Sequence, residues 1–252
     1  MFNFMRNLRA LVEKLEPTRL YFVLEGHPQQ RIDLLPEYKA NRVTVEGTPE
    51  HAASLRFKEQ LPEIITMVKN HFPITTVYHP RYECDDTVYN LLKRSSRGIA
   101  WTVASNDSDF TQLLNEFDNV QIWNPMQKEF VEKPDFEYVY WKALRGDGSD
   151  NIPGIPGIGD KRALEIVNDP DELRRLFEDK IAAETFARNV DLIKFIEWSD
   201  DEANGLLSSS PVENWASVKE TFEKYSFKSL TNEKSWDKFV STFEPLWMNS
   251  DS

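Results

Sequence analysis

The feature that most constrains this chain is the stretch Gly146–Val167, in which closely spaced aspartates are followed by a glycine- and proline-rich run. Asp147 and Asp150 are three residues apart, so on a helical turn their carboxylates would share one face and could bind one cation. The run Pro153–Gly159 cannot form a helix, and its glycines allow the backbone to approach a ligand closely. The stretch therefore combines an acidic site with an exposed-backbone site.

The second half of the stretch predicts an anion site. A helix is expected to begin near Asp160, and the N–H groups of the preceding hairpin and of that helix start would face a ligand. Lys161 and Arg162 add positive charge there. This arrangement suits a phosphodiester backbone held beside bound metal. On spacing alone, ordinary turn chemistry followed by a buried apolar loop explains the stretch equally well.

Composition limits the class of protein. With 252 residues and 40% hydrophobic content, the chain can form one sizeable domain, alone or with a smaller appendage. No apolar run approaches the roughly twenty residues of a membrane span, and the single cysteine excludes an internal disulfide and fits a reducing cytosol. A net charge of −12 argues against nucleic-acid binding, unless the carboxylates hold divalent ions that a formal total omits.

Alternating patterns predict an α/β body. Residues 1–15 form an amphipathic helix, Pro49–Phe72 a long helix with a kink or break at Pro62, and Arg31–Arg42 a basic surface connection. Four short apolar runs are predicted strands: Leu20–Leu24, Ile74–Tyr78, Ala100–Ser105 and Val120–Trp123. Helices at about 86–94 and from Phe110 alternate with them, which favours a mainly parallel central sheet flanked by helices.

Beyond residue 134 the strand signals fade and helices are predicted at about 135–145, 160–168, 171–178, 180–198, 212–224 and 235–245. The predicted domains are an α/β body at 1–133 and a helical C-terminal part at 134–252.

Acidic residues follow the second and third predicted strands and recur in the glycine-rich stretch. In open α/β sheets, loops beyond the carboxyl ends of the strands converge, so these acids are expected to meet in one crevice. Helix capping is the alternative, but one Asp per helix suffices for that, and crowded carboxylates repel unless cations neutralise them. Oxygen-only ligands favour Mg²⁺ or Mn²⁺ over zinc. The predicted metal-site acids are Glu83, Asp85, Asp86, Asp107, Asp109, Asp147 and Asp150.

Five blocks resemble, in order, those of the 5′-nuclease superfamily, which includes the 5′-nuclease domain of bacterial DNA polymerase I, the flap endonucleases and the phage 5′ nucleases. Tyr38–Arg42 resembles the base of the helical arch through which a 5′ strand threads, and Tyr82–Asp86 the Glu-Ala-Asp-Asp block. Ser105–Leu113 resembles the Asp-x-Asp block, and Asn124–Lys128 the phage ribonuclease H branch. Gly146–Lys161 is similar to the helix–three-turn–helix that grips duplex DNA.

The resemblance covers the chain from about Leu20 to Phe195 and implies a PIN-like 5′-nuclease body with an arch segment at about 32–72 and a helix–three-turn–helix at about 135–168. It implies catalytic roles for Lys39 and Arg42, which match residues that contact the scissile phosphate or the threaded strand. It also implies two divalent ions and a monovalent cation at the hairpin. The residues expected to contact DNA are Arg31, Lys39, Arg42, Gly157, Gly159, Lys161 and Arg162.

The chain departs from the family at its start. The family begins with an apolar strand that ends in a metal-binding Asp, and Met1 falls where the helix after that strand begins. The next family acid is represented by Glu25, a tentative ligand that is one methylene longer than the usual Asp. Either the true start lies upstream, which we favour, or the chain is a truncated relative that cuts slowly or not at all. A missing central strand would also expose sheet edges.

The resulting expectation is a 5′ to 3′ exonuclease and flap endonuclease that removes RNA primers or 5′ flaps in phage-type DNA replication. Its partners would be DNA and RNA–DNA substrates with 5′ ends or flaps, together with replication proteins such as a single-strand binding protein or clamp. It would be a monomer in the cytoplasm and would not bind a membrane. Two rivals are a catalytically impaired, structure-specific DNA-binding protein and a metal-dependent phosphatase of small molecules, which would not need the hairpin.

Overall fold

The structure is a computed structural model that describes residues 1–96 and 98–248. Contacts between Cα atoms divide the chain into two compact units. The first unit comprises Met1–Glu25, Thr44–Pro80 and Asn204–Ser252, and the second comprises Gly26–Val43 and Arg81–Ala203. The units interleave along the sequence, whereas the division at residue 133 predicted above is sequential and stays a prediction.

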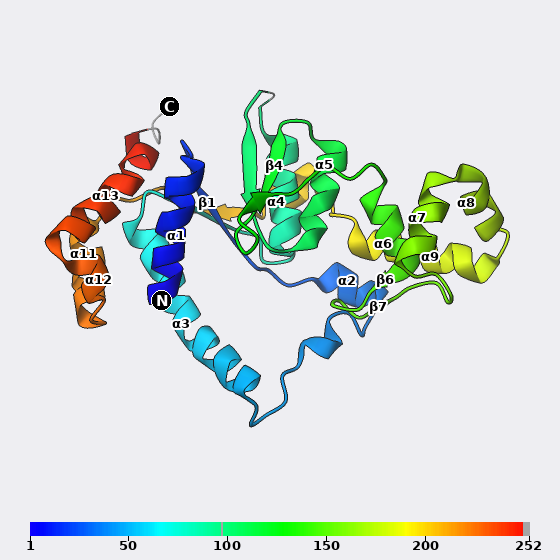
Figure 1. The fold of residues 1–252 in the computed structure, drawn as a ribbon, viewed down its shortest axis with the longest axis horizontal. Coiled ribbons are helices and arrows are strands. Elements are labelled where there is room, and N and C mark those ends of the chain that lie inside the picture. The colour runs from blue at the N-terminus through cyan, green and yellow to red at the C-terminus, as the bar shows by residue number, and fades with distance from the viewer. Residues whose placement is uncertain (97, 249–252) are drawn as a thin grey trace. The chain divides into compact units, whose positions relative to one another are not determined.

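The first unit is built around a short sheet and a set of helices (Figure 1). Its core is rich in aromatic side chains. Phe72, Phe222, Phe239 and Phe243 are fully buried and pack edge-to-face or tilted against one another, which is the favoured geometry for aromatic rings. The elements are α1 (Phe2–Leu15), β1 (Tyr21–Leu24), α3 (Pro49–His71), β2 (Thr75–Tyr78), β8 (Leu207–Ser208), α11 (Trp215–Lys224), α12 (Lys228–Thr231) and α13 (Glu233–Met248).

The second unit carries all the acidic blocks. Its first elements are α2 (Gln29–Leu34), η1 (Ala40–Arg42), α4 (Cys84–Arg94), β3 (Trp101–Ala104), η2 (Ser108–Thr111), α5 (Gln112–Glu116), β4 (Val120–Asn124) and β5 (Glu129–Phe130). They are followed by α6 (Tyr138–Arg145), β6 (Gly146–Asp147), β7 (Ile152–Pro153), α7 (Asp160–Asn168), α8 (Pro170–Leu176), α9 (Lys180–Ile193) and α10 (Asp200–Ala203).

The predicted α/β class with a helical C-terminal part is confirmed, and the predicted parallel pairing is present. β1 pairs in parallel with β2, and β3 in parallel with β4. In the described residues these pairs belong to two three-stranded sheets, ordered β1-β2-β8 and β3-β4-β5, whose third strands are antiparallel. β1 and β3 are therefore edge strands of their sheets.

One local prediction was wrong. The segment Arg31–Arg42 is not a purely surface connection: α2 forms within it, and Arg31 and Tyr38 are buried. A polar sequence predicts an exposed segment, but here the buried polar groups are satisfied by carboxylates: Arg31 pairs with Asp86 and Tyr38 with Glu83. At Pro62, where a kink or break was predicted, helix α3 does not break, and the Thr66 hydroxyl donates to the Pro62 carbonyl at 2.8 Å. Among residues 1–96 and 98–248, no helix combines the length and apolarity that a membrane crossing requires.

Candidate active site

Helix α4 presents the first acidic block at its N-terminus. Glu83 is its N-cap residue, and Asp85 and Asp86 lie in its first turn, where the helix dipole favours negative charge. No side-chain capping bond is made by Glu83, so capping does not account for the group. Glu83 and Asp86 are 1% and 0% exposed, which means that their charges need partners inside the protein.

The second acidic block follows β3. Asp107 Oδ1 accepts a hydrogen bond from the Asp109 backbone N–H at 2.9 Å, so Asp107 does cap η2 as the alternative interpretation expected. Asp109 makes no such cap: its Oδ1 accepts one hydrogen bond from Lys142 Nζ and one from the Tyr138 hydroxyl at 3.5 Å. The block thus supplies one exposed capping acid and one acid directed at other side chains.

Asp147 and Asp150 lie on a hairpin, not on the helical turn predicted above. β6 and β7 are antiparallel, with Asp147 opposite Ile152, and the intervening turn carries Asp150. Gly146 has φ +81°, and a Cβ there would lie 2.3 Å from the Gly154 backbone nitrogen, so this tight turn requires glycine. The two acids are 5% and 6% exposed.

The hairpin and the Asp109 loop bring three carboxylates together. Asp109, Asp147 and Asp150 each offer an oxygen, and these oxygens lie within 4.8 Å of one another. A set of carboxylate oxygens is the ligand set that hard divalent cations prefer. The predicted convergence of the second and third acidic blocks is therefore present.

Tyr38 connects the first block to the third. Its hydroxyl lies 3.0 Å from Glu83 Oε2 and 3.1 Å from Asp150 Oδ2. Lys39 is bonded to Glu83, and its Nζ lies 3.7 Å from Asp150 Oδ2. Arg42, whose side chain is 53% exposed, pairs with Asp150 Oδ1. Both predicted catalytic cations thus lie against the acidic cluster.

Lys142 is a site residue that sequence reasoning missed. It is 2% exposed, it bonds to Asp109, and its Nζ lies 2.7 Å from Asp147 Oδ2. The available signal was a lysine within the largely apolar run of α6, one turn after Tyr138.

Burial and mutual repulsion perturb the titration of these acids. Burial, reinforced by the charges of Glu83 and Asp86, raises the pKa of Asp85 to about 7. Burial also raises the pKa of Asp109. Burial acts in the same direction on Asp147, but hydrogen bonds from Lys142 and Ser149 outweigh it and lower the pKa of Asp147 to about 2. Divergent pKa values of this kind are typical of functional sites.

The base of the predicted arch is tied to the acidic hairpin by hydrogen bonds to backbone carbonyls. The Lys39 N–H donates to the Asp150 carbonyl at 2.9 Å, and Asn151 Nδ2 donates to the Glu37 carbonyl at 2.8 Å. Asn41 Nδ2 donates to the Gly148 carbonyl at 2.6 Å. Lys39 itself has φ +57°, a left-handed conformation that is unusual for lysine. These bonds fix where the Lys39 side chain can point.

The glycine hairpin before α7 is open, as predicted. Gly157 has φ +81°, and a Cβ added at Gly157 or Gly159 would meet nothing within 4 Å. Lys161 is exposed, whereas Arg162 is engaged by Glu165 at 3.0 Å and by Glu172. The backbone and Lys161 are thus free to face a ligand. Arg162 would have to give up its ion pairs with Glu165 and Glu172 to bind one, and exposed surface pairs of this kind are weak.

One residue predicted to contact DNA is placed differently from expectation. Arg31 is 3% exposed and binds Asp86 through both terminal nitrogens, so it does not offer the exposed cation that a DNA contact requires. Glu25 is exposed and belongs to the first unit, whereas the other seven acids belong to the second. Its role as a ligand stays a prediction.

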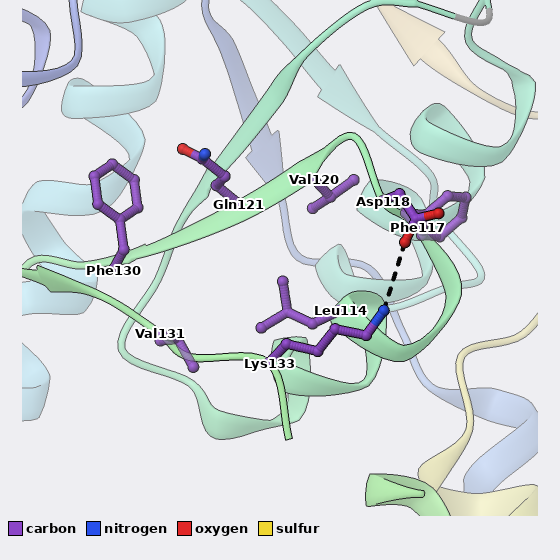
Figure 2. A pocket seen from close by; sticks show the side chains of 8 residues that line it. All are labelled: Leu114, Phe117, Asp118, Val120, Gln121, Phe130, Val131 and Lys133. Atoms are coloured by element: carbon purple, nitrogen blue, oxygen red, sulfur yellow. Dashed lines mark hydrogen bonds and ion pairs between the residues drawn. The ribbon is translucent and has the colours of Figure 1, made fainter. Parts of the chain in front are cut away.

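An open groove lies between α5 and the β4–β5 hairpin, as Figure 2 shows, with a volume of about 440 Å³. Its lining combines apolar side chains, among them Leu114, Val120 and Phe130, with polar and charged ones. Asp118 and Lys133 form an ion pair at 3.5 Å on its lining. None of the seven carboxylates lines this groove, so it is separate from the candidate active site.

Comparisons with known proteins agree with this arrangement. Residues 1–141 match the family model described as "5′-3′ exonuclease, N-terminal resolvase-like domain", and residues 134–197 match "5′-3′ exonuclease, C-terminal SAM fold". DNA polymerase I of Lactococcus lactis subsp. lactis is 27% identical over 84% of this chain and 25% of its own length. The thermostable DNA polymerase I of Thermus filiformis is 30% identical over 76% of this chain and 23% of its own length. The chain thus spans about a quarter of the length of these relatives.

Solved structures share the fold. The T5 D15 protein co-crystallised with metal ions superimposes with a TM-score of 0.62, at 19% identity, over 98% of this chain and 92% of its own. The T5 5′-exonuclease with bound zinc gives 0.64, at 20% identity, over 98% and 90%.

The α/β body, the helical C-terminal part and the carboxylates that the Asp109 loop and the β6–β7 hairpin bring together define the class of protein as one with a nuclease-type fold. Within that class, the chain belongs to the 5′-3′ exonuclease family. Its acidic cluster could hold a metal ion.

Proposed function

We propose that this chain is a divalent-metal-dependent 5′ nuclease that cleaves phosphodiesters at 5′ flaps, at duplex ends and at RNA primers. The observation that carries the proposal is the convergence of Asp109, Asp147 and Asp150, with oxygens within 4.8 Å of one another, at the hairpin that leads into the glycine-rich turn. Acids and exposed backbone amides at adjacent positions suit a substrate that carries phosphates along a duplex.

The donor set fits Mg²⁺ or Mn²⁺. Asp109, Asp147 and Asp150 would hold one ion, and Glu83 and Asp85 a second, with Asp107 acting through water. Two such ions would supply a water of lowered pKa and would stabilise charge on the phosphate and the leaving oxygen. Burial raises the pKa of Asp85 to about 7, and a cation there would favour its charged form, which is consistent with a site built for cations.

The cationic side chains have distinct roles in this proposal. Lys142 is almost fully buried between Asp109 and Asp147, so it orients these two acids and offsets their repulsion. Lys39 and Arg42 lie at the more open side of the cluster, with side chains 20% and 53% exposed. They are placed to contact a phosphate oxygen and to hold the scissile bond against the acids.

The glycine hairpin would bind the duplex. Open space around Gly157 and Gly159 lets a phosphate reach the N–H groups at the start of α7, and Lys161 adds charge. A monovalent cation at this hairpin remains part of the proposal. The related T5 flap endonuclease has a structure described as a complex with DNA and metal ions, which supports flapped DNA as the substrate class. We further propose a monomer that works with other replication proteins.

A panel of labelled substrates tests the proposed function. The purified chain is incubated with Mg²⁺ and a 5′-flapped duplex, a 3′-flapped duplex, a blunt duplex, or a duplex whose 5′ segment is RNA. We expect cleavage of the 5′-flapped and RNA-primed substrates and none of the 3′ flap. Hydrolysis of a small phosphomonoester without cleavage of any duplex would support the small-molecule phosphatase instead.

A further inference from the structure

The Asp86 carboxylate is buried and hydrogen-bonded by Arg31 and by the Ile196 backbone. It is 0% exposed, and its Oδ2 accepts a hydrogen bond from Arg31 Nη1 at 2.6 Å. Its Oδ1 accepts from Arg31 Nη2 at 2.9 Å and from the Ile196 N–H at 2.9 Å. Three of the roughly four lone-pair positions of this carboxylate are taken by one bidentate arginine and a backbone N–H, and none of its surface is exposed, which disfavours a hydrated cation on Asp86.

The Arg31 guanidinium is shared between two acids of the same helix start. Its Nη1 lies 2.6 Å from Asp86 Oδ2 and 3.0 Å from Glu83 Oε2. The paired, two-nitrogen contact goes to Asp86, which is the stronger geometry for an arginine and a carboxylate. Asp86 and Glu83 therefore both interact with one buried guanidinium. Asp86 binds it through two nitrogens and Glu83 through one, so the interaction with Asp86 is the stronger.

This sharing matters because Glu83 is a candidate ion ligand. If Arg31 lost Asp86, its whole charge would fall on Glu83, where it would oppose a divalent ion. We propose that Asp86 is a positioning residue and not an ion ligand: it holds the Arg31 guanidinium, so that the Glu83 carboxylate keeps its charge for a divalent ion. This inference rests on the proposed function, because it refines which acids serve the metal site.

The surroundings of the pair show that it is part of a fixed framework. Arg31 Nε donates to the Leu192 carbonyl at 2.8 Å, and Asn90, one turn after Asp86, binds the Ile196 carbonyl at 2.8 Å and the Trp198 N–H at 2.9 Å. Helix α9 ends at Ile193. The backbone N–H and C=O groups of the segment after it thus find hydrogen-bond partners among these side chains. Neither Arg31 nor Asp86 is free to turn toward a substrate.

The test is a comparison of Mn²⁺ binding by calorimetry, without nucleic acid, in the full chain. Asp86→Asn should weaken Mn²⁺ binding about tenfold while leaving the number of bound ions unchanged. The paired variant Arg31→Gln with Asp86→Asn removes both charges of the pair, so it should restore the affinity to within about threefold of the parent. Rescue by a second substitution is expected only if Asp86 acts through Arg31.

The matched control replaces a proposed ligand. Asp147→Asn should weaken Mn²⁺ binding, and adding Arg31→Gln should not restore it, because the lost oxygen is itself a ligand. Two results would overturn the inference: a paired variant that binds Mn²⁺ no better than Asp86→Asn, or the loss of one bound ion in Asp86→Asn. The ion count needs only the single variant, so it decides the matter even if the paired variant does not fold. Because the readout is ion binding, failure of the cleavage activity would leave it unaffected.

Discussion

The Lys142 ammonium lies 2.7 Å from Oδ2 of Asp147, and both side chains are nearly inaccessible to solvent. Burial raises the pKa of Asp147, but this pair and the Ser149 bonds outweigh it, so the pKa falls from the ordinary 3.8 to about 2. Asp147 therefore stabilises the fold at pH above about 4, and that contribution is lost as the pH falls toward about 2.

Replacing Lys142 should reverse this effect. In Lys142→Met the burial of Asp147 remains while its partner is gone, so the pKa of Asp147 should rise to about 4 or above. Carboxyl carbon resonances recorded during a pH titration in EDTA would show the change. Lys93→Met, which removes an ammonium 2.7 Å from Glu116, is the matched control and should leave Asp147 unchanged. Equal Asp147 titration in all three proteins would refute the assignment of Lys142.

Asp107→Asn should separate binding from chemistry. Asparagine keeps an Oδ1 acceptor for the Asp109 N–H, now bonded at 2.9 Å, so the η2 cap survives while the charge is lost. We expect the single-turnover cleavage rate with Mg²⁺ to fall about 100-fold. Flap affinity measured in Ca²⁺ should stay near that of the parent. A near-normal rate would show that Asp107 only caps the helix.

Lys39→Ala should reduce the cleavage rate more than the affinity for duplex DNA. Its ammonium is bonded to Glu83 and lies 3.7 Å from Asp150, so it is placed beside the reacting phosphate and not along the duplex. Single-turnover rates and flap affinities would be measured together with those of Lys238→Ala, which removes an exposed lysine of the first unit. A fall in affinity without a fall in rate would make Lys39 a backbone anchor.

Gly159→Asp should weaken duplex binding without altering metal dependence. A Cβ at Gly159 meets nothing within 4 Å, so the fold should tolerate the change, while the added carboxylate repels phosphate at the start of α7. Because phosphate contacts release counterions, log affinity should fall less steeply with log salt, by about 0.9 in slope for one lost contact. Gly159→Asn has similar bulk without the charge. Unchanged affinity and slope in Gly159→Asp would place the DNA elsewhere.

The sequence carried enough information to predict most elements. Amphipathic spacing in residues 1–15 and the apolar runs before Glu25 and Ser105 correspond to α1, β1 and β3. Periodicity detects such elements because one face or run is apolar. It could not detect the burial of Arg31 and Tyr38, because these polar groups are buried through pairing with acids distant in sequence.

The acids of the site could be predicted from the sequence, but the ion pairs and hydrogen bonds that they make could not. Spacing placed Asp147 and Asp150 together, although on a hairpin instead of a helical turn. Asp86 and Asp85 are adjacent and chemically identical, yet one is bound by arginine and the other is not, which only the tertiary contacts distinguish. Lys142 contacts Asp109 from 33 residues away, a pairing that no local pattern encodes.

The most direct test of the central claim is cleavage of a 5′-flapped duplex by the purified chain under single-turnover conditions, with Mg²⁺ or with EDTA. We predict that the flap is released with Mg²⁺ and remains intact with EDTA. Asp109→Asn should abolish release while the duplex stays bound in Ca²⁺, because Asp109 supplies one of the three clustered oxygens. Tight flap binding by the parent with no cleavage in Mg²⁺ or Mn²⁺ would contradict the account and identify a structure-specific DNA-binding protein.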